Sequence, residues 1–186
     1  MKRVLSTPFI RYWVPALIML VLIRIESTTM FSGSSTGHWL KALLRLFSIH
    51  LTADGLNTLN FVMRKAGHCL GYAMLSFLAF RAMRGTFLFM RFGFGGWRSS
   101  HAYEPLRQMG LRALWQWHWA AIGFAIAVAT AVADELHQMR LPGRSGTPRD
   151  MLLDSTAALA AQVLTYFTAR WIVKRRAVRQ PVSVGS

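Results

Sequence analysis

Two stretches in the second half of the sequence place acids at spacings that a helix would bring together. Asp134, Glu135 and Gln138 close one apolar run, and Asp150 and Asp154 open the next. Residues three or four apart share a helical face, so Gln138 can lie beside either acid and Asp150 beside Asp154. Carboxylates gathered in this way can hold cations, orient a histidine or accept hydrogen bonds from ligand hydroxyls.

Two further stretches carry groups with which these acids could pair. Lys65, His68 and Tyr72 are spaced by three and four residues, which puts them on one helical face. Arg144 lies in a Pro-Gly-Arg-Ser-Gly segment between the acidic stretches. Its glycines let backbone N–H groups and the guanidinium approach an anion closely. These residues and the acids together predict a polar site that binds an anionic ligand.

A structural interpretation stays open for the acids that close the first stretch. Asp134 and Glu135 could form structural ion pairs with Lys65, Arg140 or Arg144. Adjacent helical residues point about 100° apart, so at most one of the two acids is expected to face the centre of a bundle directly.

In the second acidic stretch, a structural role as a helix cap is open for Asp150 but not for Asp154. Thr147-Pro148-Arg149-Asp150 has the pattern of a helix cap followed by an acid three residues later, so Asp150 could serve a capping box. Asp154 is one turn too deep to cap, and it lies among apolar neighbours. It therefore needs a cation, and the candidates are Arg144, Lys65 and protonated His68.

The composition is typical of a membrane protein. Hydrophobic residues make up 53% of the chain and charged residues only 16%, whereas a soluble domain carries about 25% charged residues. The net charge of +15 comes from basic residues that flank apolar runs. This arrangement argues against nucleic-acid binding and is typical of cytoplasmic loops beside anionic lipids. The single cysteine excludes an internal disulfide, and no cofactor or metal is predicted.

The apolar runs predict an all-α, polytopic membrane protein, a four-transmembrane-helix bundle in a single domain over residues 1–176. Its predicted spans are residues 9–25, 61–83, 119–138 and 149–173. Residues 38–51 repeat polar side chains every three or four positions, which predicts one interfacial amphipathic helix. Residues 177–186 are expected to form a disordered basic tail.

The distribution of basic residues predicts the orientation. The N-terminal end, segment 84–118 and the tail carry most Lys and Arg, whereas six of the seven acids fall on the other side. The positive-inside rule then places both termini in the cytoplasm and segments 26–60 and 138–149 outside. In this topology all the polar residues above lie at the outer face. We expect one outward-facing cavity formed by His68, Asp134 or Glu135, Arg144 and Asp154.

The order of these motifs resembles that of the VanZ-like family over roughly residues 10–173. The resemblance rests on Arg64-Lys65-Ala-Gly-His68-Cys-Leu-Gly-Tyr72, Asp134-Glu135-Leu-His-Gln138, Leu141-Pro-Gly-Arg144, Asp150 and Asp154. It implies a multi-spanning protein of the bacterial inner (cell) membrane. The founding member is linked to teicoplanin resistance, which makes antibiotic resistance an expectation here. Many relatives carry a small residue, often glycine, after the last acid, where this chain has Ala157, Ala158 and Ala160. This departure is expected to change close helix packing slightly and to leave the polar group unaffected.

Two functions of different classes follow. The first is binding of an anionic or lipid-linked cell-envelope ligand, with Arg144 and Lys65 on the anion and membrane lipids as partners. The second is a membrane-embedded hydrolase or transferase acting on a lipid-linked phosphate or glycan. In the second case His68, Glu135 and Asp154 would be the catalytic residues, with an acid orienting the histidine.

Overall fold

The computed structural model describes residues 8–28, 33–96, 109–141 and 146–178, and every regular element in these ranges is a helix. The all-α prediction is therefore confirmed. The elements are α1 (Pro8–Glu26), α2 (Gly33–Leu46), α3 (Ala53–Gly96), α5 (Leu111–Leu114), α6 (Trp117–Gln138) and α7 (Pro148–Val178).

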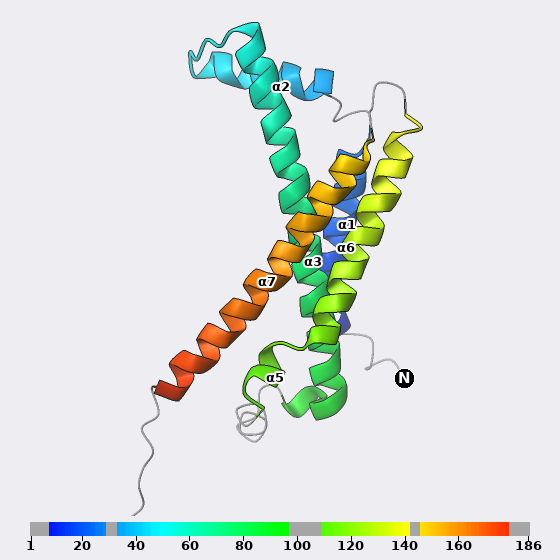
Figure 1. Ribbon diagram of the computed structural model, residues 1–186, viewed down its shortest axis with the longest axis vertical. Helices are drawn as coiled ribbons and strands as arrows, with labels where there is room; N and C mark the ends of the chain where they lie inside the picture. Colours follow the sequence, from blue (N-terminus) through cyan, green and yellow to red (C-terminus); the bar gives the residue numbers. More distant parts are fainter. Residues whose placement is uncertain (1–7, 29–32, 97–108, 142–145, 179–186) are drawn as a thin grey trace, which may run out of the picture.

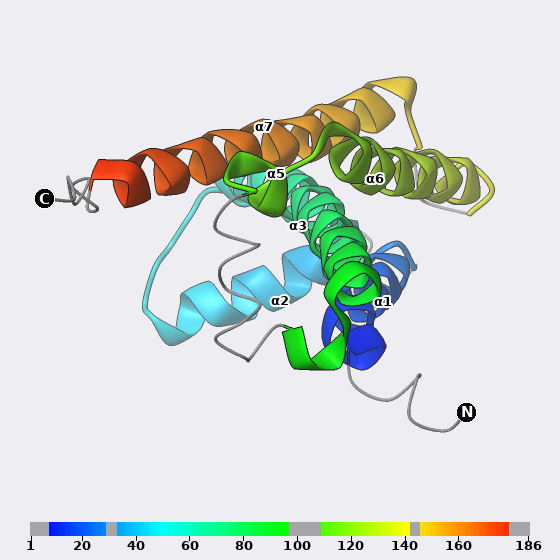
Figure 2. The ribbon, with the colours of Figure 1, turned by 90° about the horizontal axis from the view of Figure 1, so that it is seen from below.

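The long helix α3 is the centre of the fold. Helices α1, α6 and α7 all pack against it, and Figure 2 shows α1 and α7 on different sides of it. Its 44 residues correspond to about 66 Å of helix at ~1.5 Å per residue, roughly twice the hydrocarbon thickness of a bilayer, and its last turns bend away from the axis of the rest (Figure 1). Two stretches, Ala53–Arg91 and Leu111–Gln138, are long and apolar enough to cross a membrane.

Small residues on α6 allow the three longest helices to approach closely. A Cβ atom on Gly123 would lie 2.7 Å from the backbone oxygen of Ser76 on α3 and 3.1 Å from Nε2 of Gln162 on α7. One and two turns further along α6, Ala127 and Ala131 are completely buried. Spacing of small residues by four is the usual means of close helix packing in membranes.

The structure corrects several predicted boundaries. Helix α3 begins eight residues before the predicted span 61–83 and continues to Gly96, so much of the expected outer and inner loops is helical. Helix α7 continues beyond the predicted end at 173 to Val178, into the segment expected to be a disordered tail. The rest of that tail, 179–186, lies outside the described residues.

The amphipathic helix is present, but it is shifted toward the N-terminus. Helix α2 covers Gly33–Leu46 rather than 38–51, because Ser48 adopts a left-handed φ of 55°. The N–H of Ile49 then bonds to the carbonyl of Leu44, and that of Ser48 bonds to the carbonyl of Arg45. These two bonds are a Schellman ending. Figure 1 shows α2 lying across the end of the bundle at which α3 begins.

Candidate functional site

Asp134 is the centre of a buried polar cluster contributed by three helices. Its Oδ2 accepts hydrogen bonds from Ser27 Oγ (2.5 Å), Tyr72 OH (3.2 Å) and Gln138 Nε2 (2.9 Å). Asp134 and Tyr72 are 0% and 1% exposed. Three donors directed at one oxygen are the environment that a buried carboxylate requires in place of water.

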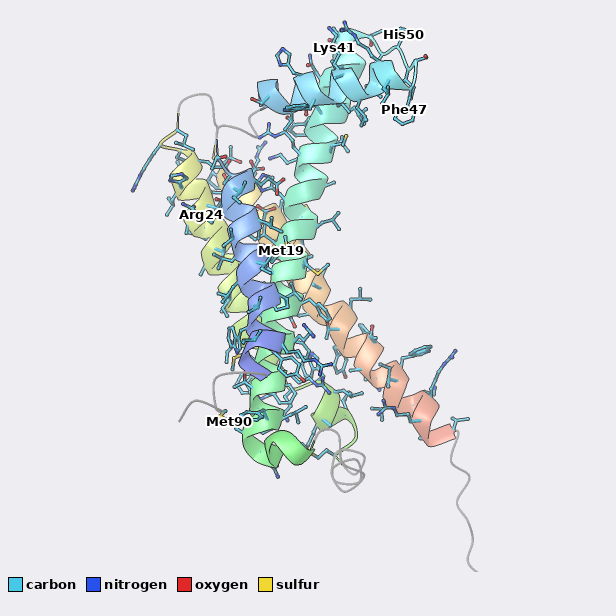
Figure 3. All side chains as sticks on the ribbon, turned by 180° about the vertical axis from the view of Figure 1, so that it is seen from behind. Met19, Arg24, Lys41, Phe47, His50 and Met90 are labelled. Atoms are coloured by element: carbon cyan, nitrogen blue, oxygen red, sulfur yellow. The ribbon has the colours of Figure 1, made fainter. Side chains whose placement is uncertain are left out.

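The other oxygen of Asp134 faces a cation from α1. Arg24 Nη1 lies 3.5 Å from Asp134 Oδ1, and half of the arginine side chain stays accessible. Figure 3 shows Arg24 toward the end of α1 that is nearer α2. Neither Arg24 nor Ser27 was among the site residues predicted from the sequence. The available signal was topological, because the first predicted span also ends at the outer face, where the other acids and bases were expected.

Glu135 is also buried, although it faces a different neighbour. Its Oε2 accepts a 2.9 Å hydrogen bond from the backbone N–H of Thr147, in the residues that precede α7. Both adjacent acids are buried, but only Asp134 is bonded from the neighbouring helices α1 and α3, so the expectation that at most one of them faces the centre of the bundle directly is not contradicted. Asp134 faces α1 and α3, and Glu135 faces the start of α7, so a separation of about 100° buries both.

The predicted cap of α7 is confirmed in its main feature. Thr147 Oγ1 accepts a hydrogen bond from the backbone N–H of Asp150 (3.2 Å), as an N-cap residue does. The Thr147 N–H bonds to Glu135, so Asp150 is not needed for the return bond of a capping box. Its carboxylate pairs with Lys65 of α3 instead.

His68 and Asp154 form the next layer between α3 and α7. His68 Nδ1 lies 3.9 Å from Asp154 Oδ2, and His68 stacks on Tyr72 with ring centroids 6.3 Å apart. Asp154 Oδ1 is buried, and it has no hydrogen-bond partner among the described residues. Of the two expected cations that the structure describes, His68 lies beside Asp154, whereas Lys65 pairs with Asp150.

One face of α3 thus contacts every acid expected at the site except Glu135. Lys65, His68 and Tyr72 contact Asp150, Asp154 and Asp134 respectively. Arg144 lies in 142–145, outside the described residues. The carboxylates of Asp134 and Asp154 are buried, and the predicted cavity that they would share with Arg144 stays a prediction.

Gly67, the residue before His68, lets the carboxylate of Glu26 approach the backbone of α3 in this layer. A Cβ atom on Gly67 would lie 2.9 Å from Oε1 of Glu26, so the carboxylate at the end of α1 rests directly on the backbone of α3. Among the described residues, no three His, Cys, Asp or Glu side chains are grouped so as to hold a metal ion.

A family model described as VanZ/LLP1 matches residues 12–170, which include the whole polar cluster. The chain belongs to the VanZ/LLP1 family. No curated protein and no solved structure matches it. The resemblance to the VanZ-like family, which was predicted from the sequence motifs, is therefore confirmed. Membership of the VanZ/LLP1 family and the two long apolar stretches together support the prediction of a membrane protein.

Proposed function

We propose that this VanZ/LLP1 protein binds an anionic, lipid-linked ligand of the cell envelope at the outer face of the bacterial inner membrane. One observation carries the proposal. In each ion pair of the described residues the basic partner is more exposed than the acid. Arg24 is 44% exposed against 0% for Asp134, and Lys65 is 31% exposed against 20% for Asp150. An approaching anion therefore meets the basic side chains first. The less exposed carboxylates hold these basic side chains in position through the ion pairs.

The arrangement of helix ends supports a four-span topology for this proposal. The cluster lies where α1 and α6 end and α7 begins, and it meets α3 roughly three to five turns after that helix begins, at Lys65, His68 and Tyr72. This fits four alternating spans if α3 enters the membrane near residue 61, where the predicted span begins. Helices α1 and α7 have 19 and 31 residues, and about 20 residues suffice to cross the hydrocarbon core. Both termini would then lie in the cytoplasm, as the basic residues indicate.

A membrane-impermeant thiol reagent tests this topology in a Cys69→Ser background. A cysteine at Leu46, exposed on α2, is expected to react in intact spheroplasts. A cysteine at Val178, exposed at the end of α7, is expected to react only after the membrane is disrupted. The opposite pattern would overturn the orientation.

Ligand binding is tested with farnesyl phosphate and farnesol, which differ only in the phosphate. Purified protein in detergent is expected to bind the phosphate at least about tenfold more tightly, because one charge-assisted hydrogen bond is worth about 1.5–3 kcal/mol. Arg24→Gln is expected to weaken binding of farnesyl phosphate roughly three- to tenfold, because the exposed part of its guanidinium is the group that the anion would meet. Arg45→Gln, the same change on the exposed α2, is the control. Equal binding of the two probes, or equal effects of the two substitutions, would refute the proposal.

One observation favours the enzyme as a second candidate. His68 and Asp154 lie side by side at 3.9 Å, an arrangement in which a carboxylate can orient a catalytic imidazole. A hydrolase would release inorganic phosphate from farnesyl phosphate, and His68→Gln would abolish this release while farnesyl phosphate still binds. Absence of phosphate release by the wild type would exclude this reaction.

The family also suggests a cellular phenotype. We propose that expression in a sensitive host raises the concentration of teicoplanin needed to stop growth, and that Arg24→Gln lowers it again while Arg45→Gln does not. An unchanged susceptibility on expression of the wild-type protein would separate this member from glycopeptide resistance.

A further inference from the structure

A groove of about 650 Å³ runs along the outside of the polar cluster, between α1 and α6. Its volume falls in the range of about 300–1,000 Å³ that is typical of sites for small molecules. All the basic lining residues gather at one end of the groove. The end without them is lined by Leu20, Ala129, Thr130 and Ala133, and the basic end by Arg24, Leu136, His137 and Arg140.

The order of these residues along α6 gives the groove a direction. Ala129 and Arg140 are eleven positions apart, which is about 16 Å along a helix. The apolar end lies within the apolar part of α6, and the basic end lies where α6 finishes. On α1, Leu20 and Arg24 repeat the same order one turn apart. A lipid has the same polarity, with a hydrocarbon chain followed by a charged headgroup.

Arg24 connects this groove to the buried cluster. One side of its guanidinium faces Asp134 Oδ1 at 3.5 Å, and the same residue lines the groove. A phosphate at the basic end would therefore share Arg24 with Asp134. Arg140 is exposed and takes part in none of the ion pairs formed among the described residues, so its charge is available to such an anion.

We propose that the groove is the binding site of a single-chain lipid phosphate, which enters sideways from the membrane between α1 and α6. The chain lies along Leu20, Ala129 and Ala133, and the phosphate lies on Arg24, His137 and Arg140. This inference rests on the proposed function, and it assigns the ligand's chain and headgroup to named residues.

A substitution that fills the groove tests the path of the chain. Ala133 is exposed and lines the groove, so Ala133→Phe is expected to weaken binding of farnesyl phosphate at least fivefold. Ala125→Phe, on an exposed position of the same helix outside the groove, is the control and is expected to change binding less than twofold. A diazirine-bearing farnesyl phosphate is expected to cross-link to peptides that contain Leu20 or Ala133.

Arg140→Gln tests the headgroup. It is expected to weaken binding of farnesyl phosphate about tenfold, since one charge-assisted contact is lost, and to leave binding of farnesol unchanged. Arg112→Gln, on the exposed side of α5, is the matched control.

The outcomes separate this inference from the proposed function. If the wild-type protein binds farnesyl phosphate no more tightly than farnesol, the proposed function itself fails. If the phosphate binds but Ala133→Phe and Ala125→Phe behave alike, or if cross-links fall outside α1 and α6, the function stands and the groove is overturned.

Discussion

Removing the charge of Asp134 while keeping its shape tests the centre of the cluster. In Asp134→Asn, the three hydrogen bonds received by Oδ2 would change from charge-assisted to neutral ones. Each bond then falls from about 2 to about 1 kcal/mol. Ser27 already donates to the Ile23 carbonyl as well, at 2.9 Å, so its share of the loss is smaller. The attraction of Arg24 is lost too. The expected decrease in the free energy of unfolding is about 3 kcal/mol.

The assay is unfolding of the purified protein by SDS titration, with Asp54→Asn as the control. Asp54 is an exposed acid in the first turn of α3, and its substitution is expected to cost less than about 1 kcal/mol. A cost for Asp134→Asn that matches this control would refute the conclusion that buried donors converge on a carboxylate.

The double variant Asp134→Leu with Arg24→Leu then separates structure from binding. Asp134 is the buried member of this pair, whereas Arg24 is 44% exposed, so stability is expected to recover relative to Arg24→Leu alone, in which the buried carboxylate has no cation. If Arg24 also binds the ligand, affinity for farnesyl phosphate stays low in this variant. Recovery of both properties would make the pair purely structural.

Three further predictions concern packing, an exposed pair and a helix end. Gly123→Ala is expected to lower the free energy of unfolding by about 2 kcal/mol, because the new Cβ meets backbone atoms such as the Ser76 oxygen at 2.7 Å; an unfolding curve identical to that of the wild type would contradict the close approach. A double-mutant cycle on Lys65 and Asp150 is expected to give a coupling of at most about 1 kcal/mol, since both side chains are partly exposed; a coupling above about 3 kcal/mol would show a buried pair. Ser48→Gly is expected to slow hydrogen exchange at the end of α2, because glycine adopts the positive φ without strain; faster exchange would contradict the Schellman ending.

The sequence alone was sufficient to predict the all-helical class and to predict which polar residues share a helical face. Local geometry is the reason, since a spacing of three or four residues places side chains on one face whatever the helix packs against. Lys65, His68 and Tyr72 do lie on one face, and each contacts an acid. The cap of α7 could be predicted for the same reason, because Thr147 and Asp150 are only three positions apart in the chain.

The tertiary structure decided which of these groups meet. Ser27 and Asp134 are 107 positions apart, and no local pattern indicates that the end of α1 supplies a donor to α6. The partner of each acid depends on how far one helix is shifted and rotated against the next. That arrangement is determined by close contacts between small residues, as at Gly123. Asp134 is therefore bonded by Ser27 and paired with Arg24, Glu135 is bonded to a backbone N–H, and the groove between α1 and α6 exists only once the helices are packed together.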